Sequence, residues 1–188
     1  AITSINTAID NIAAGNDIWV KLGTYNEIVS ISIANVAGEK TVVEGFQTTR
    51  GDNPTGANRF TISGESVRAN CITGAADGYE FRNFICSAAT GDGIATSAGG
   101  AYYNFRSTAN GTGADCGVCY FYNGELDTNT ASGFFNQTTA TPWFFFVNSH
   151  DNTGNGFAKS NVGGSLANNF FSIADTNTAD GFASSGDN

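Results

Sequence analysis

Short apolar runs alternate with polar, glycine-containing turns along most of the chain. Each run is four to eight residues long and rich in Phe, Tyr, Ile and Val. Runs of this length that are bounded by turn residues are typical of β-strands. Over the second half we predict two strands per repeat, the second one following a turn glycine. The first strand of each repeat is expected within 79–86, 102–106, 120–123, 143–148 and 168–173.

The first third of the chain predicts shorter strands and one projecting loop. Strands are expected over 17–22, 28–33, 41–46, 59–63 and 70–73. Residues 47–58 have no periodicity and contain Pro54 and two glycines, which predicts a loop. Within this loop Arg50-Gly51-Asp52 matches a three-residue adhesion motif, although the composition of an Asp-Asn-Pro turn also accounts for it.

Only the N-terminus shows helical spacing. Ile5, Ile9 and Ile12 fall on one face at the spacing i, i+4 and i+7, which predicts an amphipathic helix over about 4–14. Ser4 or Thr3 can serve as its N-cap, and Gly15 follows as a stop signal.

One turn sequence recurs near the C-terminus. The pattern Asn-Thr-x-x-Gly-Phe occupies 129–134, 152–157 and 177–182, and looser copies lie at 90–94 and 112–118. The threonines of these copies are separated by 22, 18, 23 and 25 residues. A period in this range predicts a solenoid in which each repeat forms one coil.

Stacked coils place equivalent residues in columns about 4.8 Å apart. An internal apolar column and an external polar column at the turn are therefore expected, and the turn glycines are Gly133, Gly156 and Gly181. The apolar column is predicted to contain Ile94, Val118, Phe134, Phe157 and Phe182. The polar column is predicted to contain Asn129, Thr130, Asn152, Thr153, Asn177 and Thr178. Side-chain amides can bond from coil to coil, so this column needs no ligand.

The N-terminal segment carries a family resemblance. The run from Ile9 through Gly15-Asn16-Asp17-Ile18-Trp19-Val20 to Gly23-Thr24-Tyr25-Asn26-Glu27 resembles the opening of right-handed parallel β-helix proteins of the pectin-lyase-like class. The resemblance implies that a short helix caps the first coil. It implies no single function, because the class contains lyases, glycoside hydrolases, esterases, tailspikes and adhesins.

The predicted fold is therefore all-β, a right-handed parallel β-helix with a short N-terminal capping helix. We expect a single domain over 1–188, with regular coils from about 59 onward. The last repeat begins at 177 and stops, so we expect further chain or another subunit to cover an open coil. The chain contains no Met, which favours a processed form or the front part of a longer protein.

Charge narrows the choice of partners. The net charge is −9 and the pI is near 4.3, which disfavours binding to nucleic acid and to anionic membranes. No apolar run reaches the roughly 18–20 residues that span a bilayer. Neutral glycans, cations and proteins remain as partners, and an extracellular, cell-surface or virion location is expected.

The four cysteines leave several alternatives open. Cys71, Cys86, Cys116 and Cys119 allow disulfides, with three pairings if all four take part. Buried thiols fit equally well. The Cys116-x-x-Cys119 spacing also occurs in redox and zinc sites, but no helix start is predicted there and no fourth ligand is evident. Neither a metal nor a cofactor is predicted.

Two sets of residues could carry chemistry. Arg82 and Arg106, expected on equivalent strands, could serve as a lyase base, although solvent-facing strand positions explain them as well. Alignment of the repeats stacks Asp127, His150 and Asp175 in successive coils, which could support hydrolysis, contact a cation or orient a sugar. A polar turn column in which His replaces a repeated Asp is the plainer interpretation.

The sequence favours a non-catalytic extracellular module with a structural or binding role, such as a virion spike, fibre or decoration protein or a cell-surface protein. The alternative is a polysaccharide lyase or hydrolase that acts in a groove along the coils. Asn110-Gly111-Thr112 and Asn136-Gln137-Thr138 also match the N-glycosylation pattern, which Asn-rich turns produce by chance.

Overall fold

The structure is a computed structural model that describes residues 3–31, 39–97, 99–136, 141–160 and 168–184. It contains the helix α1 (Ile5–Asp10), a 3-10 turn η1 (Gly56–Asn58) and a series of strands. The strands of the first half are β1 (Asp17–Lys21), β2 (Thr24–Tyr25), β3 (Val29–Ile31), β4 (Thr41–Phe46), β5 (Phe60–Ser63), β6 (Ile72–Gly74), β7 (Tyr79–Ser87) and β8 (Asp92–Thr96). Those of the second half are β9 (Gly100–Thr108), β10 (Thr112–Cys116), β11 (Cys119–Asp127), β12 (Phe134–Asn136), β13 (Trp143–His150), β14 (Phe157–Lys159), β15 (Asn168–Phe170), β16 (Ile173–Asp175) and β17 (Phe182–Ser184).

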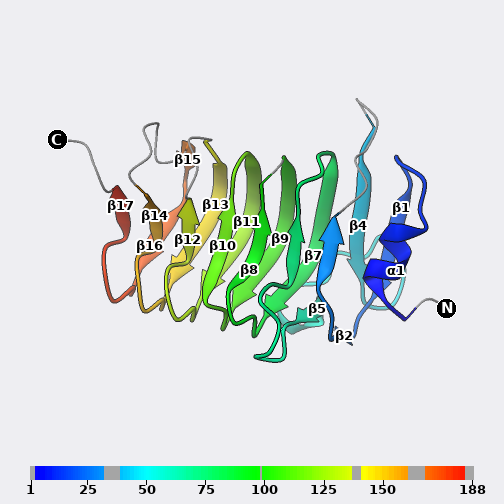
Figure 1. Cartoon of the computed structure of the whole chain (residues 1–188), viewed down its shortest axis with the longest axis horizontal. Coiled ribbons are helices and arrows are strands. Elements are labelled where there is room, and N and C mark those ends of the chain that lie inside the picture. The colour runs from blue at the N-terminus through cyan, green and yellow to red at the C-terminus, as the bar shows by residue number, and fades with distance from the viewer. Residues whose placement is uncertain (1–2, 32–38, 98, 137–140, 161–167, 185–188) are drawn as a thin grey trace.

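The strands form two parallel sheets that are wound together into a solenoid. The larger sheet has the order β1-β4-β7-β9-β11-β13-β15, with β2, β5 and β16 attached at its side. The smaller sheet has the order β17-β14-β12-β10-β8-β6-β3. Figure 1 shows the coils following one another along the long axis from α1 to β17. This arrangement confirms the parallel β-helix with a short N-terminal helix.

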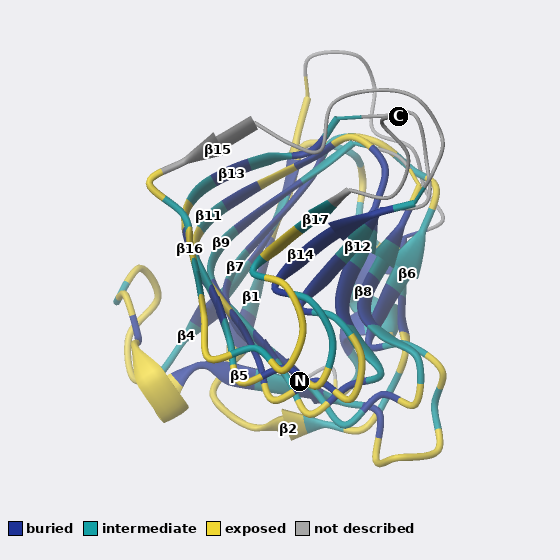
Figure 2. Cartoon of the chain, turned by 90° about the vertical axis from the view of Figure 1, so that its left-hand side faces the viewer, coloured by how far each residue is buried: buried dark blue, intermediate teal, exposed yellow. Residues whose placement is uncertain are grey.

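Each long strand of the larger sheet bends at one residue in the left-handed backbone region. These residues, which we call the first corner, are Asn83, Asn104, Asn123, Phe146 and Phe171, with φ values of 58°, 47°, 51°, 57° and 55°. A second corner lies five residues further on, at Ala88, Ala109, Thr128, Asp151 and Thr176. The two corners divide each coil into three faces that enclose the buried interior (Figure 2).

Aromatic rings stack through the interior from coil to coil. Tyr102 lies 6.1 Å from Phe81 and 5.2 Å from Phe121, and Phe121 lies 5.1 Å from Phe144, measured between ring centroids. These four rings are buried and face inward from β7, β9, β11 and β13. Offset stacking of this kind is a favourable arrangement for buried aromatic rings, and here it connects four successive coils.

The apolar column of the smaller sheet differs from the predicted one at one position. The strand register aligns Ile72, Ile94, Ala114, Phe134, Phe157 and Phe182. Val118 is instead 44% exposed, so its assignment to this column was wrong. The cause is a shorter turn in this repeat: Thr112 pairs with Asp92 rather than with Thr90, so Gly113 takes the place of the turn glycine.

The asparagines of the repeated turn form an internal ladder, which we call the inner ladder: Asn110, Asn129, Asn152 and Asn177. The Asn129 Oδ1 accepts a hydrogen bond from the Asn110 amide, and the Asn152 Oδ1 accepts from both the amide and the Nδ2 of Asn129. Asn129 and Asn152 are buried, so the external position predicted for these side chains was wrong. The threonines Thr130, Thr153 and Thr178 do face solvent.

Close approach explains the repeated turn glycine. A Cβ atom at Gly133 would lie 2.0 Å from the Ser149 Oγ and 2.9 Å from the Asn152 Nδ2. Gly113 and Gly156 are equally tight against an asparagine of the ladder, at 2.9 Å from Asn129 and 2.8 Å from Asn177. The glycine thus makes room for the inner ladder rather than for a left-handed turn.

The capping helix is shorter than the predicted span of 4–14. It starts with Ser4 as N-cap, whose side chain accepts a hydrogen bond from the Thr7 amide, as predicted. It ends at Asp10, because the Asn11 side chain bonds back to the Thr7 carbonyl and the chain leaves the helix there. Gly15, with φ of +80°, lies beyond this end and forms a separate turn. No helix in the described part of the chain is long and apolar enough to cross a membrane.

Residues 47–58, between β4 and β5, contain only the turn η1, and hydrogen bonds hold this loop in place. The Asp52 carboxylate accepts hydrogen bonds from the amides of Gln47, Thr48 and Thr49. The same carboxylate is the group that an Arg-Gly-Asp motif would present to a receptor, so its engagement weighs against adhesion through this motif. The far end of the loop is fixed by a hydrogen bond from the Asn104 side chain to the Pro54 carbonyl.

Candidate functional site

Two cavities lie between the loop 47–58 and the first corner. The first has a volume of about 520 Å³ and the second about 370 Å³. Both are lined by Thr55 from the loop and by Asn104 and Asn123 from the corner, so the two cavities adjoin each other. We call the pair of cavities the corner groove.

The first cavity is built around an arginine. The Arg82 guanidinium lies 2.6 Å from a Glu80 carboxylate oxygen and 3.8 Å from one of Glu44. It also sits over the Tyr103 ring, 5.3 Å from its centroid. Its Nε is buried and has no hydrogen-bond partner among the described residues.

The second cavity is lined by two arginines that differ in their partners: Arg106 pairs with carboxylates, and Arg59 donates to a backbone carbonyl. Arg106 makes a bidentate pair with Asp127, at 2.8 Å and 2.7 Å, and lies 3.6 Å from Glu125. Arg59 is 5% exposed and donates from its Nε to the Gly56 carbonyl at 3.0 Å. No carboxylate of the described residues comes within 4.0 Å of the Arg59 guanidinium. Burial accordingly lowers the pKa of Arg59.

Two asparagines bring unused polar groups to the groove. The Asn123 side chain is exposed, lines both cavities and makes no hydrogen bond to any described residue. Asn148, in the second cavity, has a buried Oδ1 without a partner. Buried polar atoms without partners are uncommon in folded proteins, and they often mark the position of a ligand or water.

The paired charges of the groove are held in their ionised forms. Burial raises the pKa of Glu80, but hydrogen bonds from Lys40 and Arg82 outweigh it, so this pKa lies below the usual range. The pKa of Asp127 is lowered in the same way, because the bonds from Arg106 and Thr128 outweigh its burial. Hydrogen bonding to Asp127 raises the pKa of Arg106. These groups are poor proton donors or acceptors at neutral pH.

A second aromatic stack lies outside the sheet, next to the groove. Tyr103 and Tyr122 stack at 4.6 Å with their planes 3° apart, and Tyr122 and Phe145 stack at 4.7 Å with planes 5° apart. The faces of these rings cover one another, and Arg82 lies over Tyr103 at one end. The stack therefore stiffens the outer surface and offers no open ring face along its length.

The predicted trio Asp127, His150 and Asp175 occupies equivalent positions, as the strand register shows. Its members nevertheless make separate contacts. Asp127 is buried against Arg106, His150 Nδ1 lies 2.9 Å from Asp151, and Asp175 accepts from the amide of Thr176. The alignment was correct, but the side chains do not converge on a common point.

Arg82 and Arg106 were predicted to be equivalent in adjacent coils, but the strand register places them three residues apart. Arg82 pairs in register with Tyr103, and Arg106 with Ile85. Both side chains are partly exposed on the outer surface. The structure therefore places one arginine before the first corner and the other after it, in different cavities of the same groove.

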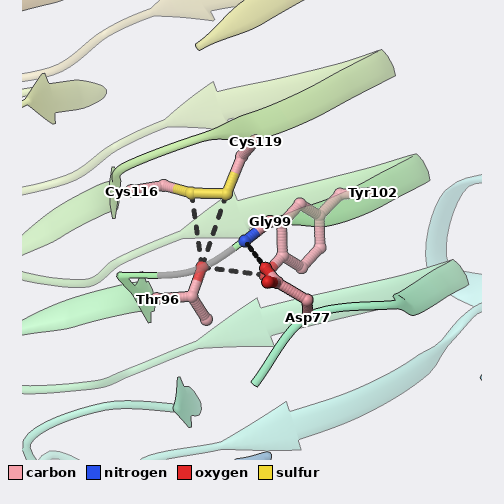
Figure 3. The surroundings of a disulfide bond; sticks show 6 residues. All are labelled: Asp77, Thr96, Gly99, Tyr102, Cys116 and Cys119. Atoms are coloured by element: carbon pink, nitrogen blue, oxygen red, sulfur yellow. Dashed lines mark hydrogen bonds between the residues drawn. A yellow bond between two sulfur atoms is a disulfide. The ribbon is translucent and has the colours of Figure 1, made fainter. Parts of the chain in front are cut away.

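The cysteines lie in the interior, away from the groove. Cys116 and Cys119 form a disulfide, and the Thr96 hydroxyl lies 3.3 Å from the Cys116 Sγ and 3.1 Å from the Tyr102 hydroxyl (Figure 3). Cys71 and Cys86 are buried thiols. The Cys71 Sγ donates to the Ser87 carbonyl at 3.4 Å, and burial raises the pKa of Cys86. The described residues contain no cluster of three or more potential His, Cys, Asp or Glu metal ligands.

Sequence reasoning missed the groove, although a signal for it exists. Asn83, Asn104 and Asn123 each follow the outward residue of a strand, at Arg82-Asn83, Tyr103-Asn104 and Tyr122-Asn123. An asparagine in mid-strand is a sign of a left-handed corner. Asn110 and Asn136, which match the glycosylation pattern, are buried and so closed to glycosylation in the folded protein.

Comparison of the chain with protein-family models, with curated proteins and with solved structures finds no match in any of the three.

Proposed function

We propose that this chain is a non-catalytic binding module for oligosaccharides, built on a β-helix of the pectin-lyase-like class, with the ligand in the corner groove. The main support is the exposed Asn123 side chain, which lines both cavities and makes no hydrogen bond to any described residue. Sugar hydroxyls both donate and accept hydrogen bonds. Amides and guanidinium groups in fixed positions complement them.

The rigidity of the groove also supports binding. One wall is a sheet whose outer aromatic side chains are stacked, and the other is a loop fixed by Asn104 and Asp52. A preformed site loses little conformational entropy when a ligand enters it.

The states of the paired ionisable groups favour binding over hydrolysis. A glycosidase needs one carboxyl group whose pKa is raised so that it can protonate the leaving group. Among the carboxyls that pair with the groove arginines, Glu80 and Asp127 have lowered pKa values.

One observation favours a second candidate, a polysaccharide lyase. Arg59 is buried in the second cavity, and its pKa is lowered, the direction that a base for proton abstraction requires. Under this alternative Arg59, rather than Arg82 or Arg106, would remove the proton, because pairing with Asp127 raises the pKa of Arg106.

An extracellular, cell-surface or virion setting and a partner at the last coil complete the proposal. The acidic surface and the disulfide are compatible with such a setting. Phe182 stacks on Phe157 at 5.1 Å and is 48% exposed. Further chain or another subunit would bury this ring.

A glycan panel tests the proposal. Neutral and uronate-containing oligosaccharides are titrated by calorimetry, and the same mixtures are then assayed for reducing ends and for the ultraviolet absorbance of unsaturated products. We expect binding without cleavage, and weaker binding in Asn123→Ala than in the control Thr153→Ala at an exposed site elsewhere on the turn. Cleavage that disappears in Arg59→Ala would establish the lyase instead, and the absence of any binding would refute both.

A further inference from the structure

The first corner changes its residue type partway along the solenoid. In three successive coils this corner is an asparagine: Asn83, Asn104 and Asn123. In the next two coils Phe146 and Phe171 adopt the same left-handed conformation, with φ of 57° and 55°. Both rings project into solvent, with exposures of 63% and 80%. They stack on each other at 5.4 Å with planes 7° apart.

Neither backbone preference nor core packing explains this change. Asparagine adopts the left-handed region readily, whereas a bulky side chain there is an outlier that costs about 1–3 kcal/mol. Burial in a core would offset such a cost, but these two rings remain mostly exposed. Strained backbone positions cluster at ligand clamps and active sites, which makes these two exposed rings candidates for a ligand contact.

The position of Phe146 connects the two rings to the groove. Phe146 lines the second cavity together with Arg106, Asn123, Glu125 and Asn148. Phe171, one coil further on, covers one face of its ring. On the opposite side, the strand register places Asn123 next to Phe146, and both residues line the second cavity. The wall therefore combines a flat apolar surface with polar groups around it.

We infer that Phe146, supported from behind by Phe171, is a stacking subsite for one sugar ring at the end of the corner groove. A pyranose ring has an apolar C–H face and polar edges, and this combination fits an aromatic face bordered by Asn148, Glu125 and Arg106. Phe146 would touch the ligand, whereas Phe171 would act as a positioning residue. The inference rests on the proposed function, since it identifies how the groove holds its oligosaccharide.

Replacement of each phenylalanine by the residue that the corner uses elsewhere gives a sharp test. Phe146→Asn and Phe171→Asn remove the ring and suit the left-handed backbone, so the urea midpoint is expected to stay unchanged or to rise. The dissociation constant for cellohexaose, xylohexaose, mannohexaose or a galacturonate hexamer, whichever the wild type binds, should increase about tenfold in Phe146→Asn. It should increase about threefold in Phe171→Asn. Phe146→Tyr keeps an aromatic ring at this position and should bind with the dissociation constant of the wild type.

Each outcome decides the question. If the wild type binds a hexasaccharide and Phe146→Asn binds it equally well, the stacking subsite is wrong and the proposed function stands. If none of the four probes binds the wild type, both are wrong. A lower urea midpoint with unchanged binding would show that the ring is structural. Sedimentation tests for self-association. If the wild type forms dimers and Phe146→Asn does not, the ring contacts a second copy of the chain, which also overturns the inference.

Discussion

Asparagine recurs at two places in each coil, and the two places use it differently. In the inner ladder, the Asn152 Nδ2 donates to the Leu126 carbonyl at 2.9 Å and to Asn177 at 2.8 Å, while its Oδ1 accepts from Asn129. At the first corner, the Asn83 Nδ2 bonds to the Gly45 carbonyl, but the Asn123 side chain makes no hydrogen bond to any described residue. The side chains of the inner ladder use their hydrogen-bonding groups within the fold, whereas at the first corner the side chain of Asn123 does not.

The difference shows that repetition alone does not identify a binding site. The inner ladder produces the conspicuous Asn-Thr-x-x-Gly-Phe signature, because each amide must meet the next coil and each glycine must make room for it. The first corner leaves a weaker sequence signal and yet lines the groove. A repeated polar residue suggests ligand binding only where its neighbours leave its hydrogen bonds unused.

Loss of one amide from the inner ladder is expected to have the largest effect. Asn152→Ala removes its bonds to Leu126, Asn129 and Asn177, and leaves several buried groups unpaired. The free energy of unfolding should fall by about 3 kcal/mol. Urea denaturation followed by circular dichroism measures it.

Asn123→Gly is the matched control at the first corner, because glycine removes the amide and still suits the left-handed backbone there. It should lower the free energy of unfolding by less than about 0.5 kcal/mol. Equal losses in Asn123→Gly and Asn152→Ala would remove the distinction between the two columns.

The turn glycines should come next. Gly133→Ala places a Cβ atom 2.8 Å from the Gly156 carbonyl and close to the Asn152 amide, so the backbone must shift. We expect a loss of about 2 kcal/mol, again from urea denaturation. Gly23→Ala is the control, because the nearest atom to its Cβ would be 3.8 Å away. Tolerance of both changes would show that the inner ladder is looser than its hydrogen bonds imply.

Acid should weaken the corner groove and leave the inner ladder intact. The pKa values of Glu80 and Asp127 are lower in the folded protein than in the unfolded chain. Their stabilising contribution is therefore complete above the unfolded values, about pH 4, and is lost as the pH falls through the folded values. The amides of the ladder do not titrate.

Urea midpoints between pH 7 and pH 2 measure this dependence. Asp127→Asn should be less stable by about 1 kcal/mol at pH 7, since its partner Arg106 is partly exposed, and should lose less on acidification. Asn152→Ala should retain the wild-type dependence on pH. An unchanged pH profile in Asp127→Asn would exclude this ion pair as a source of acid sensitivity.

The sequence predicts the coils well because the apolar residues and turn glycines that define each repeat can be recognised directly along the chain. It even aligns Asp127 with His150 and Asp175. It fails at Val118, because the step from Ile94 to Ala114 is two residues shorter than the step from Ile72 to Ile94, which moves the turn glycine to Gly113. It also fails for Arg59, whose position depends on the path of the loop 47–58 over the sheet. A groove formed by segments that are distant in sequence requires the three-dimensional structure.

The smallest change in stability should accompany a clear change in binding. Asn104 and Asn123 both line the groove, but Asn104 also bonds to Pro54 of the loop and to Asn83 of the preceding coil. Asn104→Gly should therefore weaken both the fold and the affinity for the bound hexasaccharide, whereas Asn123→Gly should raise the dissociation constant about threefold to tenfold at nearly constant stability. Calorimetric titration at matched protein stability separates the two effects. If Asn123→Gly binds as tightly as the wild type, the Asn123 amide does not contact the ligand. The difference between hydrogen-bonded and unbonded asparagines would then have no functional meaning at this corner.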